Sequence, residues 1–142
     1  MPESTTAFRI DDLDLFADCT KAQLRRIGSL TSYLHIPKDH VLIREGSVGR
    51  EFIVIRSGSA RVTRKTDDGI AQVAEVGTGD FLGEMALLSG TRRTATATAI
   101  TDLEVLVSSV GEFRSILAIA PSVAHKVHRV SLDRASNLVT AA

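Results

Sequence analysis

The chain has 142 residues, and its 17 Lys and Arg side chains are balanced by 17 Asp and Glu side chains, so its formal net charge is zero. This length supports one hydrophobic core, and the balanced charge offers no basic surface of the kind that binds nucleic acid. One cysteine excludes an intramolecular disulfide, and neither a signal peptide nor a run of about 18 apolar residues is visible, so we expect a cytoplasmic domain without membrane insertion.

The chain opens on polar residues and then turns helical. We expect residues 1–9 to be a flexible N-terminus and residues 10–142 to form one domain. Asp18 or Thr20 is a candidate N-cap for a helix that runs to about Leu30. Three apolar side chains share one face of this helix: Leu24, Ile27 and Leu30.

The middle of the chain consists of short alternating segments separated by Gly, Pro, Asp and Ser, which is typical of β-strands. The predicted strands are Ser32–Ile36, Val41–Arg44, Glu51–Arg56, Ala60–Lys65, Ala71–Val76, Thr94–Ala99 and Leu103–Ser108. Asp67-Asp68-Gly69 is the clearest hairpin turn among them. Short strands at this spacing predict a closed or double-sheet β-roll of the jelly-roll kind, in which the sheet edges are hidden.

A glycine turn, a short helix and two adjacent arginines lie between the last two groups of strands. Gly83 leads into an apolar helix that begins at Glu84, where an anion would meet free backbone N–H groups and the positive end of the helix dipole. Arg93 follows a second glycine turn and is placed to close on the same anion with a two-pronged contact, whereas Arg92 is expected at the surface. The Glu84 carboxylate suits a sugar hydroxyl attached to that phosphate. These residues predict a phosphate cradle.

The last third of the chain returns to helical spacing. Phe113, Ile116 and Leu117 share a face, and Pro121 begins a further helix at a favoured first-turn position. The apolar stripe of that helix is Val123, Val127, Val130 and Leu138, with Lys126, Arg129 and Arg134 outside it. The expected fold class is therefore α+β, a β-roll flanked by an N-terminal helix and C-terminal helices.

The segment Leu82 to Leu88, followed after a spacer by Arg92-Arg93-Thr94-Ala95, resembles the phosphate-binding cassette of the cyclic nucleotide-binding domain family. The similarity covers roughly Leu15 to Leu138. Upstream segments match the turn glycines and core strands of that family's β-roll: Pro37 to Leu42, Glu45-Gly46, Gly49, Phe52 to Ile55 and Ser57-Gly58. The chain departs from the family pattern where Leu82 replaces an aromatic residue, Arg92 a frequent proline and Thr94 a frequent alanine.

The resemblance implies a regulatory sensor domain that binds a cyclic nucleotide, preferably cyclic AMP, and carries no enzymatic activity. Thr94 is the residue that would improve binding of cyclic GMP. Ligand binding would move the C-terminal helices, a hinge around residues 113–121 and a lid beyond it, and an effector protein or a fused domain would respond. The lid would cover the base with Arg134 or Leu132.

The resemblance also implies a set of contacts. The phosphate would meet the backbone from Gly83 to Ala86 and the Arg93 guanidinium, and Glu84 would accept a hydrogen bond from the ribose 2′-hydroxyl. The apolar side chains of the sugar and base pocket would be Leu82, Met85, Val73 and Val76. The expected ligand-binding residues are Leu82, Gly83, Glu84, Met85, Ala86, Val73, Arg93, Thr94 and Arg134, with no cofactor and no metal.

Three other classes of protein share parts of this pattern. A transcription factor of the catabolite-activator type requires a helix-turn-helix after the last helix, and we expect none because the sequence ends at Ala142. A cupin-like metalloenzyme requires clustered ligands, whereas the histidines, His35, His40, His125 and His128, have no such grouping. A degenerate β-roll used as a protein-interaction module would have lost Glu84 or Arg93, and this remains the alternative hypothesis.

Overall fold

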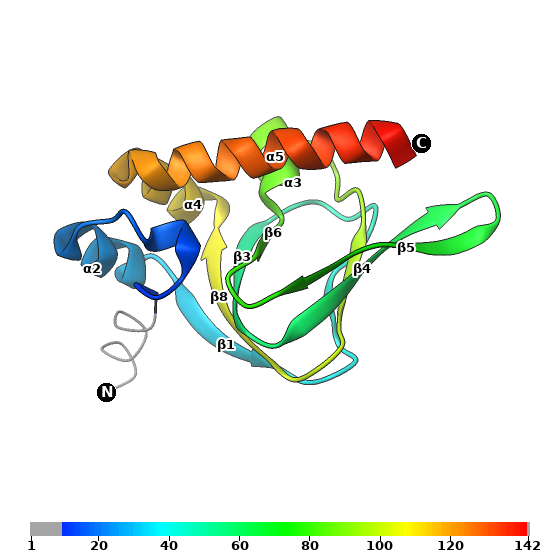
Figure 1. Ribbon diagram of the computed structural model, residues 1–142, viewed down its shortest axis with the longest axis horizontal. Coiled ribbons are helices and arrows are strands. Elements are labelled where there is room, and N and C mark those ends of the chain that lie inside the picture. The colour runs from blue at the N-terminus through cyan, green and yellow to red at the C-terminus, as the bar shows by residue number, and fades with distance from the viewer. Residues whose placement is uncertain (1–9, 142) are drawn as a thin grey trace.

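The computed structural model describes residues 10–141, with side chains described as far as residue 134. Two four-stranded antiparallel sheets form a β-roll (Figure 1). The first sheet has the order β1 (Ser32–Ile36), β8 (Leu103–Ser109), β3 (Glu51–Ser57) and β6 (Phe81–Leu82). The second has the order β2 (Val41–Ile43), β7 (Thr96–Ala99), β4 (Ser59–Thr66) and β5 (Gly69–Gly77). The predicted β-roll and all seven predicted strands are confirmed.

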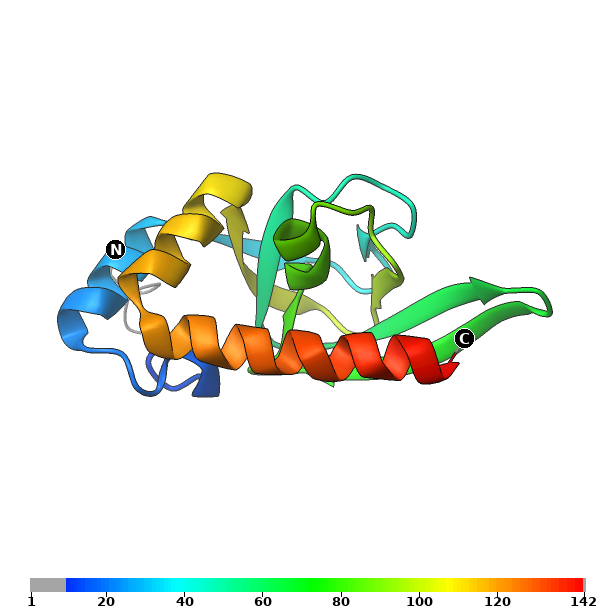
Figure 2. The ribbon, with the colours of Figure 1, turned by 90° about the horizontal axis from the view of Figure 1, so that it is seen from above.

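Helices flank the roll as predicted. They are the 3₁₀ turn η1 (Asp14–Phe16) and the α-helices α2 (Lys21–Ser29), α3 (Glu84–Ser89), α4 (Val110–Ile119) and α5 (Pro121–Ala141). Thr20, and not Asp18, caps α2, because its hydroxyl accepts from the Gln23 backbone N–H while the Gln23 side chain accepts from the Thr20 N–H. The long helix α5 runs across the roll and passes beside α3 (Figures 1 and 2).

The alternation of side chains along β3 divides the core into two clusters. Phe52 and Val54 face the helices, whereas Ile53 and Ile55 face the interior of the roll. Because both faces of β3 are covered by core residues, the sequence from Phe52 to Ile55 is a continuous run of apolar residues. The Phe52 ring stacks on Phe113 of α4 at 4.4 Å between centroids, which fixes the helices against the first sheet.

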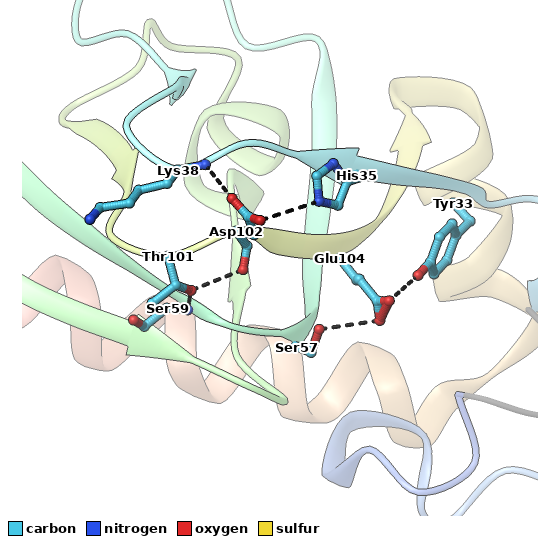
Figure 3. Close-up of polar contacts among 8 residues, drawn as sticks. All are labelled: Tyr33, His35, Lys38, Ser57, Ser59, Thr101, Asp102 and Glu104. Carbon is cyan, nitrogen blue, oxygen red and sulfur yellow. Dashed lines mark hydrogen bonds and ion pairs between the residues drawn. The ribbon is translucent and has the colours of Figure 1, made fainter.

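Polar contacts hold the outer face of the first sheet together (Figure 3). The two carboxylate oxygens of Glu104 accept hydrogen bonds from the Tyr33 and Ser57 hydroxyls. Oδ2 of Asp102 lies 3.9 Å from Nε2 of the exposed His35. These contacts join the edge strand β1 to β8 and β3, so they serve the sheet and explain the polar side chains of this face.

The turn at Gly58 generates a prediction about stability. Gly58 has a φ of +100°, and a Cβ there would lie 2.4 Å from the Asp102 carbonyl oxygen, whereas Gly46 has a φ of +85° in open space. We expect Gly58→Ala to lower the free energy of unfolding by about 2–4 kcal/mol and Gly46→Ala by only about 1–2 kcal/mol. Urea denaturation of both variants measures the difference, and equal losses would contradict the steric argument.

Candidate functional site

A cavity of about 210 Å³ lies between the second sheet, α3 and α5. Its apolar wall is formed by Ile43, Val62, Val73, Ala74, Val76, Leu82, Met85, Ala86, Ala95 and Ala97. The rest of its lining is Gly83, Thr94 and Thr96 and the three ionisable side chains Arg64, Glu84 and Arg134. A mostly apolar hollow with a few polar groups is the usual character of a small-molecule site.

The turn at the start of α3 accepts only glycine. Gly83 is the N-terminal flanking residue of α3 and has a φ of +93°. A Cβ at this position would lie 2.5 Å from Nη1 of Arg93 and 2.7 Å from the Glu51 carbonyl oxygen. Both the backbone conformation and the lack of space therefore exclude a side chain, and the first turn of α3 is left open toward the cavity.

Glu84 is the most unusual residue of the cavity, because its side chain is charged and only 1% exposed. Its Oε1 accepts a hydrogen bond of 2.5 Å from Nη1 of Arg134. Its Oε2 is buried and has no hydrogen-bond partner among the described residues. A buried carboxylate oxygen without a donor is costly, so this atom marks a position that a ligand donor would satisfy.

Arg134 brings α5 into the site. Besides its bond to Glu84, its Nη2 donates to the Phe81 carbonyl oxygen at 2.6 Å, and its guanidinium lies 5.1 Å from the centre of the Phe81 ring. The sequence put Arg134 outside the apolar stripe of the last helix but among the expected ligand-binding residues, and these contacts place it on the side of α5 that faces the roll, at the cavity. Leu132, the other candidate to cover a base, is 57% exposed and does not line the cavity.

Arg93 is buried behind the cavity wall. Its Nη1 donates to the Gly83 carbonyl at 2.9 Å and its Nη2 to the Glu51 carbonyl at 2.7 Å. The side chain is 7% exposed and does not line the cavity in this structure, so its contact with a phosphate stays a prediction. Arg92 is exposed as expected and donates to the Gly46 carbonyl at 3.1 Å.

Burial shifts the pKa of both charged groups at this turn. Removal from water raises the pKa of the Glu84 carboxyl, and the nearby Arg134 guanidinium opposes that rise. Burial likewise lowers the pKa of Arg93, against the attraction of Glu51 and Glu84. The two residues thus hold opposite charges in a poorly solvated turn, where each needs its partners.

The structure places eight of the nine predicted ligand-binding residues around the cavity and leaves Arg93 behind its wall. Those at the cavity are Val73, Leu82, Gly83, Glu84, Met85, Ala86, Thr94 and Arg134. Sequence reasoning missed Arg64, although it follows Val62 by two residues and therefore shares its face of β4. No three His, Cys, Asp or Glu side chains within the described part of the chain are grouped to hold a metal ion. None of the described helices has the length and apolarity needed to cross a membrane.

Residues 33–119 match the family model described as the cyclic nucleotide-binding domain. A cyclic nucleotide-gated potassium channel of Rhizobium etli is 35% identical over 99 residues, which cover 70% of this chain and 26% of the channel. A cAMP-dependent protein kinase regulatory subunit of Yarrowia lipolytica is 40% identical over 108 residues, 76% of this chain and 28% of the subunit. The chain thus spans little more than a quarter of these curated relatives.

Among solved structures, the regulatory subunit of a cAMP-independent protein kinase A from Trypanosoma brucei superposes with a TM-score of 0.83. The likeness covers 92% of this chain and 47% of that chain at 22% sequence identity. At this level of identity the comparison shows the fold alone, which is the same β-roll with its flanking helices.

The Glu84–Arg134 pair predicts a pH-dependent stability. A carboxyl whose pKa is raised by folding stabilises the folded state fully below its unfolded pKa, and this contribution is lost as the pH rises through the folded pKa. Arg134→Ala removes the cation that limits the rise above the ordinary value of 4.5. We therefore expect its stability deficit relative to wild type to grow from about pH 4 to about pH 8, where it reaches about 1–3 kcal/mol.

Thermal or urea unfolding across this pH range measures the deficit. The matched control is Arg134→Ala in a Glu84→Gln background, where no carboxyl titrates and the deficit should not depend on pH. The same deficit at every pH in the native background would contradict the role given to the pair.

Proposed function

The chain belongs to the cyclic nucleotide-binding domain family, and we propose that it is a regulatory domain that binds a cyclic purine nucleotide, preferably cyclic AMP, without chemistry of its own. The observation that carries this proposal is the buried Oε2 of Glu84, which lacks a donor at the edge of an apolar cavity. A ribose 2′-hydroxyl is a neutral donor of the right kind, and it leaves the Arg134 bond to Oε1 intact. The missing donor at Oε2 therefore supports the expected role of Glu84 as the acceptor for the ribose 2′-hydroxyl.

The phosphate would lie beside Gly83, where the open turn exposes the first backbone N–H groups of α3. The six-residue helix is short, so its dipole alone is a weak attraction, and the adjacent positive charge of Arg93 adds to it. Arg93 already lies against the Gly83 carbonyl, so it needs only to exchange carbonyl acceptors for phosphate oxygens to reach the ligand. A charge-assisted, two-pronged bond to a phosphate is stronger than the neutral bonds it would replace.

The same site would couple the ligand to α5. Glu84 holds Arg134 through one oxygen and would hold the sugar through the other, so ligand and helix share one carboxylate. The cavity of about 210 Å³ is smaller than the roughly 300–1,000 Å³ usual for ligand sites, so a nucleotide also requires α5 to adjust. Ligand binding then shifts the equilibrium between two positions of α5, and the size of that shift is set by the difference in the ligand's affinity for the two positions. An effector protein or a fused domain would read the position of α5.

Use of the roll solely as a protein-interaction module is the alternative. The T. brucei kinase is named as cAMP-independent, so sharing this fold does not by itself imply regulation by cyclic AMP. Against the alternative stands the cavity itself, in which a buried carboxylate oxygen would be left without a donor for no structural benefit.

The first prediction from this proposal concerns Glu84. We expect isothermal titration calorimetry to show micromolar or tighter binding of cyclic AMP, and 2′-deoxy cyclic AMP to bind about 5- to 15-fold more weakly, the equivalent of about 1–1.5 kcal/mol for one hydrogen bond. Glu84→Ala should bind both nucleotides equally, because the acceptor for the 2′-hydroxyl is gone. If the wild-type domain does not distinguish the two ligands, Glu84 does not contact the ribose.

A second prediction from this proposal concerns the two adjacent arginines. Arg93→Ala should cost about 2–5 kcal/mol of cyclic AMP binding, because a desolvated phosphate loses its charge-assisted partner. Arg92→Ala is the matched control and should leave affinity nearly unchanged. Because Arg93 also bonds the carbonyls of Gly83 and Glu51, circular dichroism and the melting temperature of each variant establish that it folds. Arg93→Lys keeps the charge without the fork. A larger loss for Arg92→Ala would contradict the assignment.

A further inference from the structure

A second cavity, of about 320 Å³, lies on the outer face of the second sheet. It sits at the base of the hairpin formed by β4 and β5, which projects beyond the rest of the roll (Figures 1 and 2). Arg64 and Thr96 line both cavities, where β7 begins, whereas the other residues of the outer cavity do not line the first one. The proposed function makes no use of this outer cavity.

Three cations line the outer cavity, and none of them is paired through its side chain within the described part of the chain. They are Arg61, Arg64 and Lys65, and the Nε of Arg64 is buried without an acceptor. Glu45 is the one carboxylate of the lining, and its Oε1 already accepts a hydrogen bond of 2.9 Å from the Lys65 backbone N–H. Glu75 lies opposite Arg61 on β5 but does not line the cavity. Three cations against one carboxylate favour an anionic occupant.

The donors of the outer cavity repeat along one face of β4. Arg61, Thr63 and Lys65 occupy alternate positions of the strand, so successive donors are about 6.6 Å apart. Thr98 and Thr96 of β7 lie directly opposite Arg61 and Thr63. Because threonine side chains are short beside those of arginine and lysine, they form the floor of the hollow, and their hydroxyls supply further donors.

The outer cavity is open at one end along the direction of the strand. The ladder between β4 and β7 stops at the pair of Thr63 and Thr96, whereas β4 continues to Thr66. Ile70 lines this end of the cavity and is 74% exposed. An elongated occupant therefore has room to continue past the last donor, where it meets an apolar side chain.

We propose that the outer cavity docks an extended acidic segment of a partner protein, with Asp or Glu at every second position. Side chains on one face of an extended chain repeat at the same spacing as the donors of β4. Three acidic side chains would thus meet Arg61, Thr63 and Lys65 in step, in charge-assisted bonds at the two cations. An apolar side chain beyond them would contact Ile70. The chemistry suits a peptide better than a nucleic acid, because no described residue of the lining is aromatic and bases have nothing to stack on.

Fluorescence anisotropy with synthetic peptides tests the spacing. The labelled peptide Glu-Val-Glu-Val-Glu-Val should bind the domain saturably, and added salt should weaken the complex. The peptide Val-Val-Val-Glu-Glu-Glu has the same composition and charge but cannot place its carboxylates on successive donors of one face, so it should bind about fivefold more weakly or worse. The peptide Lys-Val-Lys-Val-Lys-Val should not bind.

Variants of the two cations that belong to this cavity alone test the residues. Arg61→Gln combined with Lys65→Gln should weaken the alternating acidic peptide by about tenfold and abolish the preference over the block peptide. Arg61→Glu combined with Lys65→Glu should instead bind the lysine peptide. The matched control is Arg25→Gln, which replaces an exposed arginine of α2 outside the lining and should change nothing. Melting temperatures establish that each variant is folded.

Equal affinity for the alternating and the block peptide would overturn the proposal, because net charge alone would then explain the attraction. The same holds if the alternating peptide does not bind, or if inorganic pyrophosphate or a single-stranded oligonucleotide displaces it at equimolar concentration. A preference for alternating carboxylates that is lost in the double glutamine variant and kept in Arg25→Gln supports the proposal. None of these measurements includes a cyclic nucleotide, so their result is independent of the proposed function.

Discussion

The arrangement of the site depends on one constraint, the removal of the Glu84 carboxylate from water. A buried charge needs a partner, and here the partner comes from α5, fifty positions further along the chain. Arg134 reaches Glu84 only because α5 lies along α3, and it is held there by the Phe81 carbonyl and the Phe81 ring. The position of the last helix is thus set in part by the electrostatic need of one residue in the cavity wall.

A second buried cation explains the small residues of the same region. Side chains at Gly83 and Gly49 would run into Arg93 or its neighbours, since a Cβ at Gly49 would lie 2.6 Å from that of Ala86. The sequence interpretation tied Gly83 to phosphate binding and gave Gly49 only as a turn glycine of the β-roll. The structure adds another role for both, because they make room for the Arg93 guanidinium, which ties the Gly83 turn to the first residue of β3. Loss of a glycine here would therefore disturb the fold as well as the ligand.

The parts of the fold that could be predicted are those that local patterns determine. Alternation along the strands and the turn residues between them located seven of the eight strands, whereas β6 has only two residues and no period to read. Arg134 was expected at the site, but its bond to Glu84 was not, because the apolar stripe of α5 is loose and a long side chain reaches past its own face. Arg64 was missed for another reason. An isolated arginine in a strand is usually taken as exposed, and only the arrangement of the sheet shows that this one faces the cavity.

The charges around the cavity bear on the kind of ligand it can hold. Glu84 neutralises only one of the two lining arginines, so Arg64 leaves one positive charge in excess, and Arg93 adds another from behind the wall. A cyclic phosphodiester carries a single negative charge, whereas a nucleoside triphosphate would bring several into a space with few donors. Both its size and its limited excess of positive charge therefore favour a small monoanion whose remaining polar groups are spread along its length. A cyclic nucleotide has this character, because its phosphate, its ribose hydroxyl and its base are spread along one small monoanion.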